Sequence, residues 1–564
     1  MYSAFLRFVR EKIWLACLLC LLPVLIYILV FKAIALNVNY VAFDDIIILG
    51  IIPEFSNADL AGKWKLLTTL FPEHRLVFSR SAILLLQKAF GTIDLVWPMI
   101  IANTCWALCA VVFYRAFRHL RMSFWYFVPV MWLWFNIQSF ENIFWGVSSL
   151  CNFGVILFVL CALYFAAYRP EKPAFALLFA IAATFTYGNG LMVFPVIGLL
   201  FLLAGYRMQF FITLGTTLVI AAIYFIDFTP ITQNLDFSNP QQVKEGFLGF
   251  FGFIGSWATL TAYSTPTSGL YTAVAAGMLM IAALLLLFRQ QYIPLWHSTW
   301  LKARYTNRTA LFALAIAIFT GITALALTYK RIPTDTFEGM FKGRYRMYST
   351  LWCVALYFGF LAIVQNATRR RFAPAMVVAA IVLNLVLLHS NFAEAVNNRR
   401  AAIAQEFNAR YNADWLGVRM FSMDQQHYEK IRSYYRSDDP LAENWNPMAD
   451  AVPCDSIYEL DEVGQLGNHV VVGFHKEFFK PEKDYSDGAY VILKSPGHVY
   501  ASPPNQVSVP LKTTLRRGMY FSKGLNASFH TANVEPGIYQ IYLLVRKNGR
   551  NFFYCTGKTW EEKQ

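Results

Sequence analysis

Apolar residues follow one another in long runs through the first two thirds of the chain, separated by short polar segments. A helix needs about 20 mostly apolar residues to cross a bilayer. The pattern therefore predicts a polytopic α-helical membrane protein with about 11 transmembrane helices. They cover residues 13–35, 94–114, 122–138, 147–167, 173–187, 189–206, 209–226, 269–288, 309–328, 347–365 and 372–390.

Basic residues between the apolar runs predict the orientation. With the N-terminus on the inner side, every inner connection carries Lys or Arg, as the positive-inside rule requires. An odd number of spans then places the C-terminal region outside. Residues 247–260 are interpreted as an interfacial or re-entrant segment on the outer face, because another span there would place the basic stretch 289–308 outside.

Polar positions also interrupt the long first outer loop, residues 36–92. Leu60, Trp64 and Leu67 recur in it at helical spacing, which predicts an amphipathic helix along the membrane surface. A second helix is expected after Pro72, since proline fits the first helical turn.

The long apolar runs end near His389. Residues 391–436 are charged and alanine-rich, and they predict a helix. From about residue 468, short β-branched and aromatic runs alternate with Gly, Pro, Asn and Asp, which predicts a small β-sandwich. The predicted parts are a transmembrane domain at 1–390, a helical linker region at 391–465 and a β-sandwich-like, extracytoplasmic domain at 466–564.

Composition supports the membrane class. The chain is 57% hydrophobic with a mean hydropathy of +0.43, whereas soluble domains are about 45–50% apolar. The net charge of +14 lies mainly in short clusters between spans, so we expect a lipid bilayer as partner and no nucleic acid. Cys454 and Cys555 lie in the tail, where an oxidising compartment would allow them to pair. The sequence leaves that pairing open.

Two acidic residues, Asp44 and Asp45, follow the first predicted span. Charged groups are costly in lipid, so we expect both at a water-facing edge. Adjacent side chains point in different directions. One aspartate is then a candidate general base, and the other a candidate for orienting an acceptor or holding a cation. The alternative is that both are solvated or cap the following segment.

A second polar group follows in the same loop, with Glu73, His74 and Arg75 adjacent and Arg80 close behind. On a helix, Glu73 and Arg80 would share a face at two-turn spacing. The alternative is an ordinary surface ion pair. His74 has no second histidine at metal-ligand spacing, so it is weak evidence for a metal.

The loop after the ninth span is predicted outside but is rich in basic residues. It contains Lys330, Arg331, Lys342, Arg344 and Arg346, opposed in its own sequence by Asp335 and Glu338. A bound anion would explain cations on this side, since arginine can hold a phosphate with two parallel hydrogen bonds. The alternative is that an outer loop tolerates basic residues once earlier helices have set the topology.

Aromatic and amide side chains gather at the predicted outer ends of the spans. Tryptophan marks membrane interfaces in general. The added Glu141, Asn142 and Asn189, with Trp145 nearby, also suit the hydroxyls and faces of a sugar. No P-loop, GxSxG, paired CxxC or HExxH motif occurs, which argues against an ATP-driven pump, a serine hydrolase and a zincin protease.

In their order and outer placement, these motifs resemble the GT-C superfamily of integral-membrane glycosyltransferases. The chain looks closest to bacterial members that modify O-antigen or other surface glycans. The resemblance spans about residues 1–390. The matching pieces are Phe43-Asp44-Asp45, Pro72-Glu73-His74-Arg75 with Arg80, Asn142-Ile143-Phe144-Trp145-Gly146, Gly188-Asn189-Gly190 and Gly343-Arg344-Tyr345.

The resemblance implies a polyprenyl-phosphate-linked sugar donor and a glycan acceptor. Asp44 or Asp45 would take the acceptor proton in an inverting displacement, with Glu73 as a further catalytic residue that orients the acceptor or the adjacent arginine. It implies no certain cofactor, and a divalent cation stays open. The implied substrate and lipid-phosphate contacts are His74, Arg75, Arg80, Glu141, Asn142, Trp145, Asn189, Lys342, Arg344, Tyr345 and Arg346.

The resemblance also implies a bacterial inner (plasma) membrane, with a cytoplasmic N-terminus and a periplasmic C-terminal domain. One rival is a membrane transporter or flippase, which would place ionisable residues near mid-membrane. Here the charges gather at the outer ends of the spans, which favours an interfacial enzyme. The other rival is an O-antigen polymerase or ligase, in which the early aspartate pair would lack a role.

Overall fold

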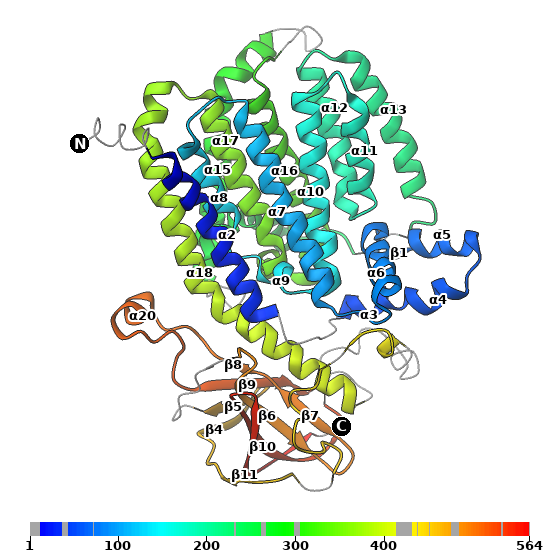
Figure 1. Ribbon diagram of the computed structural model, residues 1–564, viewed down its shortest axis with the longest axis vertical. Helices are drawn as coiled ribbons and strands as arrows, with labels where there is room; N and C mark the ends of the chain where they lie inside the picture. The colour runs from blue at the N-terminus through cyan, green and yellow to red at the C-terminus, as the bar shows by residue number, and fades with distance from the viewer. Residues whose placement is uncertain are drawn as a thin grey trace.

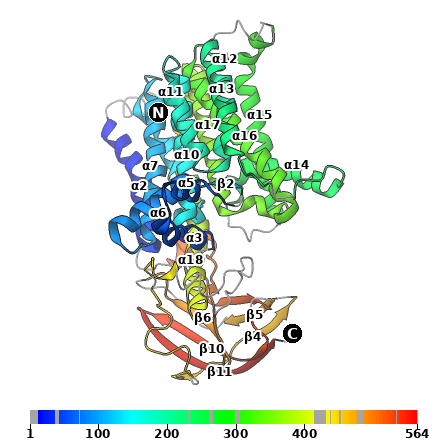
Figure 2. The same ribbon diagram turned by 90° about the vertical axis from the view of Figure 1, so that its right-hand side faces the viewer.

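A bundle of long helices stands above a strand-rich C-terminal region, and one helix, α18 (Asn366–Tyr411), runs from the first into the second (Figures 1 and 2). This is a computed structural model. It describes residues 12–35, 43–71, 73–229, 233–260, 267–297, 305–412, 431–436, 438–449, 452–467, 469–474, 484–531 and 534–562.

In the described part of the chain, eight helical segments are long and apolar enough to cross a membrane, as a multi-pass helical protein requires. The candidate spans are Ile13–Ala35, Val96–Arg118, Gly146–Tyr168, Arg207–Tyr224, Gly269–Arg289, Arg308–Asp335, Gly343–Ile363 and Asn366–Tyr411. The other three predicted spans coincide with shorter apolar helices at Phe124–Trp134, Pro173–Thr184 and Gly188–Leu203. The count of 11 spans stays a prediction.

The helices of the bundle follow the chain as continuous or broken segments. They are α2 (Ile13–Ala35), α7 (Val96–Arg118), α8 (Val128–Trp134), α9 (Phe140–Ile143), α10 (Gly146–Tyr168), α11 (Pro173–Thr184), α12 (Val193–Leu203), α13 (Arg207–Tyr224), α14 (Pro240–Gly255), α15 (Thr267–His297), α16 (Arg308–Asp335) and α17 (Arg346–Ile363). Short 3-10 turns η2 (Gly188–Met192) and η5 (Gly343–Tyr345) precede α12 and α17.

The first outer loop folds into four short helices and a hairpin beside the lower end of the bundle (Figure 1). The elements are α3 (Phe43–Leu49), α4 (Ile51–Asn57), α5 (Leu60–Thr68), β1 (Leu70–Phe71), β2 (His74–Arg75) and α6 (Val77–Phe90). Asp59 caps α5 by accepting the Gly62 N–H at 2.8 Å. A helix is found where one was predicted; α5 buries none of its residues and leaves Trp64 exposed, and its position along a membrane surface stays a prediction.

The helix expected after Pro72 begins only at Val77. The β1–β2 hairpin lies between, with Glu73 in its turn and His74 opposite Phe71. The expectation that Glu73 shares a helix face with Arg80 is therefore wrong. The sequence could not predict this hairpin, because strands of two residues are too short to show an alternation of apolar and polar positions.

The tail contains two antiparallel sheets. The strands are β3 (Ser456–Ile457), β4 (Glu462–Leu466), β5 (His469–Phe474), β6 (Gly488–Lys494), β7 (Val499–Ser502), β8 (Pro504–Asn505), β9 (Leu525–His530), β10 (Gly537–Lys547) and β11 (Arg550–Glu562), with β3 added parallel to β11. One sheet has the order β3-β11-β10-β6-β7 and the other β4-β5-β9-β8. Val472, Phe529, Val491 and Leu543 belong to one buried cluster that the two sheets share. The tail thus has the strand-rich composition expected of it.

Two features fix the tail. Cys454 and Cys555 form a disulfide with their Cα atoms 5.5 Å apart, which settles the pairing that the sequence left open. The end of α18 is also bound to β7, because the Asn408 amide donates to the Ala501 carbonyl at 2.9 Å and accepts the Ala501 N–H at 2.7 Å.

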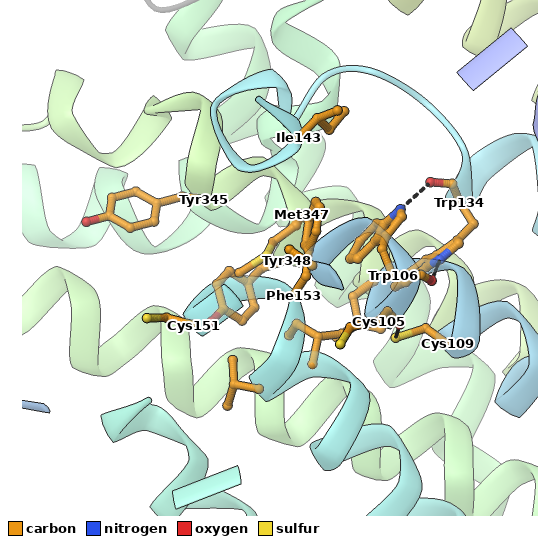
Figure 3. Packing of buried hydrophobic residues seen from close by; sticks show 14 of the residues in the cluster. Cys105, Trp106, Cys109, Trp134, Ile143, Cys151, Phe153, Tyr345, Met347 and Tyr348 are labelled. Carbon is orange, nitrogen blue, oxygen red and sulfur yellow. Dashed lines mark hydrogen bonds between the residues drawn. The ribbon is translucent and has the colours of Figure 1, made fainter. Parts of the chain in front are cut away.

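Aromatic stacking supports the helix bundle from within (Figure 3). The rings of Trp106 and Trp134 lie 3.7 Å apart, and each indole N–H donates to the other residue's carbonyl. Phe153 stacks on Trp106 at 4.5 Å. Figure 3 places Tyr348 and Met347 of α17 beside this stack, so α7, α8, α10 and α17 share one rigid contact.

The helices α14 and α15 cross with their backbones in direct contact. A Cβ atom at Gly255 would lie 2.0 Å from the Ala273 carbonyl oxygen, and one at Gly277 would lie 1.9 Å from the Phe251 carbonyl oxygen. A side chain at either glycine would therefore push the two helices apart.

We therefore predict that Gly277→Ala lowers the midpoint of thermal unfolding, with a loss of about 1–3 kcal/mol from overpacking. The matched control is Gly321→Ala on α16, where the new methyl would meet the Trp352 ring at an ordinary 3.7 Å. Differential scanning fluorimetry of the purified chain measures both variants. Equal midpoints for the two would contradict the close crossing.

Candidate active site

Asp45 is fully buried against the start of α10. Its Oδ1 accepts the Val147 N–H at 2.9 Å, and a Cβ added at Gly146 would lie 3.4 Å from its Oδ2. The first turn of a helix carries unpaired N–H groups and a partial positive charge, which favour a carboxylate. Asp45 therefore joins the first outer loop to α10. The side chain of Asp44 lies outside the described residues.

Glu73 reaches across to the end of α16. Its Oε1 lies 3.2 Å from Lys330 Nζ, and its backbone carbonyl accepts the Tyr224 hydroxyl at 2.9 Å. Both ionic side chains remain partly exposed. Glu73 is thus placed beside the basic loop, although the sequence separates the two by 257 residues.

His74 is packed between the hairpin and the turn before η2. Its ring centroid lies 4.1 Å from that of Tyr187, and a Cβ at Gly188 would lie 2.5 Å from its Nδ1. Among the described residues this buried Nδ1 has no hydrogen-bond partner. Burial lowers the pKa of His74 to about 4; nearby Glu73 opposes the shift and Arg331 adds to it. The imidazole is therefore neutral at pH 7.

Arg75 and Arg80 bind backbone carbonyls in this structure. Arg75 donates from Nε to Tyr224 O at 2.8 Å, from one terminal nitrogen to Thr68 O at 2.5 Å, and from the other to Ile226 O. Arg80 donates to the carbonyls of Leu67 and Thr69. Both guanidinium groups are buried. Their contacts give them a scaffolding role that links α5, α6 and the end of α13.

Glu141 caps the turn that carries Arg344. Its two carboxylate oxygens accept the Gly343 N–H at 3.1 Å and the Arg344 N–H at 3.3 Å. The Arg344 guanidinium lies 3.8 Å from the same carboxylate and 5.8 Å from the Trp145 ring, with 26% of its side chain exposed. Arg344 is therefore held beside an aromatic face and is partly exposed.

Amide groups complete the same region. Asn142 donates to the Arg344 carbonyl at 2.8 Å and accepts from the Asn152 amide at 2.8 Å. Asn189 donates to the Tyr348 hydroxyl at 2.6 Å, while its buried amide oxygen has no hydrogen-bond partner in the described part of the chain. The His74 Nδ1 and the Trp145 Nε1 are likewise buried without a hydrogen-bond partner among the described residues, so three polar atoms of this region have unused bonding capacity.

The remaining basic residues of this loop have partners of different kinds. Lys342 Nζ forms an ion pair with Asp335 at 2.6 Å, while the buried Arg346 donates to the Phe341 carbonyl and to Asn391 Oδ1. Tyr345, also buried, lies under the Arg344 guanidinium, which is 5.4 Å from its ring. Glu73 and Glu141 thus oppose cations of this loop in addition to Asp335.

Arg331 is one of the basic residues noted in its loop, but neither Arg331 nor Tyr187 is predicted individually from the sequence as a site residue. Arg331 is half-buried near His74 and Asp335, and its charge acts on both. Tyr187 packs on His74. The Arg-rich outer loop was a signal for Arg331, whereas a lone tyrosine at a span end gives none.

No group of three or more His, Cys, Asp or Glu side chains in the described ranges is arranged to hold a metal ion. Asp44, whose side chain is outside those ranges, is not covered by this observation.

The chain matches no protein-family model and no curated protein. Among solved structures, the Archaeoglobus fulgidus oligosaccharyltransferase, in complex with Zn and sulfate, is similar over 77% of this chain with 13% sequence identity and a TM-score of 0.32. The similarity covers 59% of that chain, less than two thirds of its length. A likeness this low carries no argument about this protein.

The low pKa of His74 predicts an acid-sensitive fold. Histidine in the unfolded chain takes up a proton below its ordinary pKa of 6.5, whereas folded His74 does so only below about 4. Protonation therefore favours unfolding as the pH falls from 6.5 through 4. We expect His74→Gln, which cannot titrate, to lose less thermal stability over this range than the parent chain. Unfolding midpoints at several pH values provide the measurement, and parallel curves would contradict the assignment.

Proposed function

We propose that this protein is a GT-C-type glycosyltransferase. It transfers a sugar from a polyprenyl-phosphate donor to a surface glycan, such as lipopolysaccharide O-antigen, at the outer face of a bacterial inner membrane. The observation that carries the proposal is the convergence of three distant segments at one end of the bundle. The acidic loop with Asp45 and Glu73, the aromatic residue Trp145, and the basic turn with Arg344 all meet there.

The acidic pair supplies the base in this proposal. Asp45 accepts the Val147 N–H at the start of α10, where the partial positive charge of a helix N-terminus favours a carboxylate, and this hydrogen bond fixes the short helix that also carries Asp44. One aspartate accepts the proton of the acceptor hydroxyl and the other positions it. Direct displacement at the anomeric carbon then inverts its configuration, and the lipid phosphate leaves.

The cations receive the leaving phosphate. Arg344 is partly exposed beside Trp145, and Arg331 is half-buried near His74. Two guanidinium groups at an interface stabilise the charge that develops on the leaving oxygen. Trp145 and Asn189 suit the sugar face and hydroxyls, while the buried Asn142, bonded to the Arg344 carbonyl and the Asn152 amide, holds the turn that carries Arg344. No step of this proposal requires a metal, although a divalent cation stays compatible with it.

The orientation is part of the proposal. The positive-inside pattern and the Cys454–Cys555 disulfide both support a tail on the oxidising, periplasmic side.

For the base, we predict that Asp44→Asn together with Asp45→Asn lowers transfer of a labelled sugar from polyprenyl phosphate by at least about 10²-fold, the usual contribution of a general base. Asparagine still accepts a hydrogen bond, so the cap on α10 is retained. The single variants separate the base from its positioning neighbour.

The matched control for this experiment is Asp94→Asn. Asp94 accepts the Val96 N–H at 2.9 Å at the start of α7, the same capping contact at another helix. It should leave transfer unchanged. Full activity in the double variant would remove the aspartates from the mechanism.

For the donor site, we predict that Arg344→Ala weakens binding of the lipid donor about 10- to 100-fold, as expected for one charge-assisted hydrogen bond, with a smaller effect on the acceptor. Titration with polyprenyl monophosphate and acceptor kinetics measure the two effects. Lys88→Ala, an exposed cation of α6, controls for general surface charge. Equal donor affinity in the Arg344 variant and the parent would exclude the phosphate contact.

For the orientation, we predict that Ile538→Cys reacts with a membrane-impermeant maleimide in cells whose outer membrane alone is permeable. The parent side chain is exposed on β10, away from the disulfide. Labelling that requires rupture of the inner membrane would reverse the topology.

A further inference from the structure

One segment leaves the sandwich between β8 and β9 and forms the short helix α20 (Leu511–Arg517). None of its residues is buried. Leu511 and Leu515, four positions apart, share one helix face, and Leu515 is 78% exposed. Val507, just before the helix, is exposed as well. A small exposed apolar surface of this kind calls for a partner.

The segment is fastened to the outer end of the membrane part of α18. The Thr514 hydroxyl lies 3.0 Å from His389 Nε2, and the Tyr520 hydroxyl donates to the His389 carbonyl at 2.5 Å and accepts the Ala393 N–H at 3.0 Å. Figure 1 shows α20 beside α18, at about the height where the membrane span α2 ends. The helix is therefore held at the boundary of the apolar layer rather than with the rest of the sandwich.

The charges of α20 fit the same location. Lys512, Arg516 and Arg517 are exposed, and within the described part of the chain none of them forms an ion pair. Leucines beside unpaired cations are the pattern of segments that lie in a membrane interface, with the apolar groups at the acyl boundary and the cations at headgroup phosphates.

We propose that α20 is a membrane-surface anchor. Leu511 and Leu515 enter the bilayer leaflet on the side of the strand-rich domain, and the three cations contact the phosphates of that leaflet. Because the protein already holds the helix at this height, so short an anchor needs no membrane affinity of its own. It fixes the strand-rich domain against the bilayer at a second point besides α18. This inference does not depend on the glycosyltransferase proposal.

The direct test is the membrane depth of a nitroxide at Leu515→Cys, in the full chain with its seven free cysteines replaced and the Cys454–Cys555 disulfide kept. The chain is placed in nanodiscs of phosphatidylglycerol and phosphatidylcholine. We expect oxygen to relax this label more than a water-soluble nickel chelate does. Ile538→Cys is the control, since it pairs with Glu561 near the C-terminus, which Figure 1 shows well below α20. Equal access of the chelate to both labels would overturn the proposal.

Hydrogen exchange on the unmodified chain is a second test, which applies if the cysteine replacements disturb folding. Amides of residues 511–517 should exchange several-fold more slowly in nanodiscs than in detergent of low charge, and the difference should shrink when Lys512, Arg516 and Arg517 are all changed to Gln. Protection that is equal in detergent and bilayer would instead indicate contact with a second copy of the chain. Rapid exchange in both detergent and bilayer would show that α20 lies in water. Either result contradicts the membrane anchor.

Discussion

The guanidinium group of Arg75 makes the contacts on which the arrangement of the site depends. Helix C-termini leave carbonyls without intrahelical partners. Arg75 binds such carbonyls at the ends of two helices, Thr68 of α5 and Tyr224 of α13, and also that of Ile226. One buried cation therefore fixes the first outer loop across the end of the bundle. Removal of it would leave several buried carbonyls unsatisfied at once.

The positions of the neighbouring site residues follow from these contacts of Arg75. Because Arg75 holds the hairpin, its neighbours face fixed partners, with Glu73 at Lys330 and His74 at Tyr187. Asp45 holds the start of the loop against α10. The acidic loop and the basic loop, which are distant in sequence, are thus joined at one end of an apolar bundle. The proposed transfer requires both an acceptor base and a phosphate site there.

The general architecture could be predicted from the sequence because it depends on composition and periodicity. The apolar helices, the helix α5 and the strand-rich tail all appear where expected. The roles of Arg75 and Lys330 could not be predicted, since their partners are distant: a carbonyl 149 residues away for Arg75 and a carboxylate 257 residues away for Lys330. A cation counted as unopposed in its own loop can be neutralised by another loop, and only the fold shows this.

The central claim is that a lipid phosphate binds at the outer end, between the acidic and the basic loops. Its most direct test is a cryo-electron microscopy structure of the chain in nanodiscs with polyprenyl monophosphate. The account predicts phosphate density within hydrogen-bond distance, about 2.7–3.2 Å, of the Arg344 or Arg331 guanidinium. Phosphate density at the opposite end of the bundle, beside Arg369–Arg371, with none near Arg344, would contradict it.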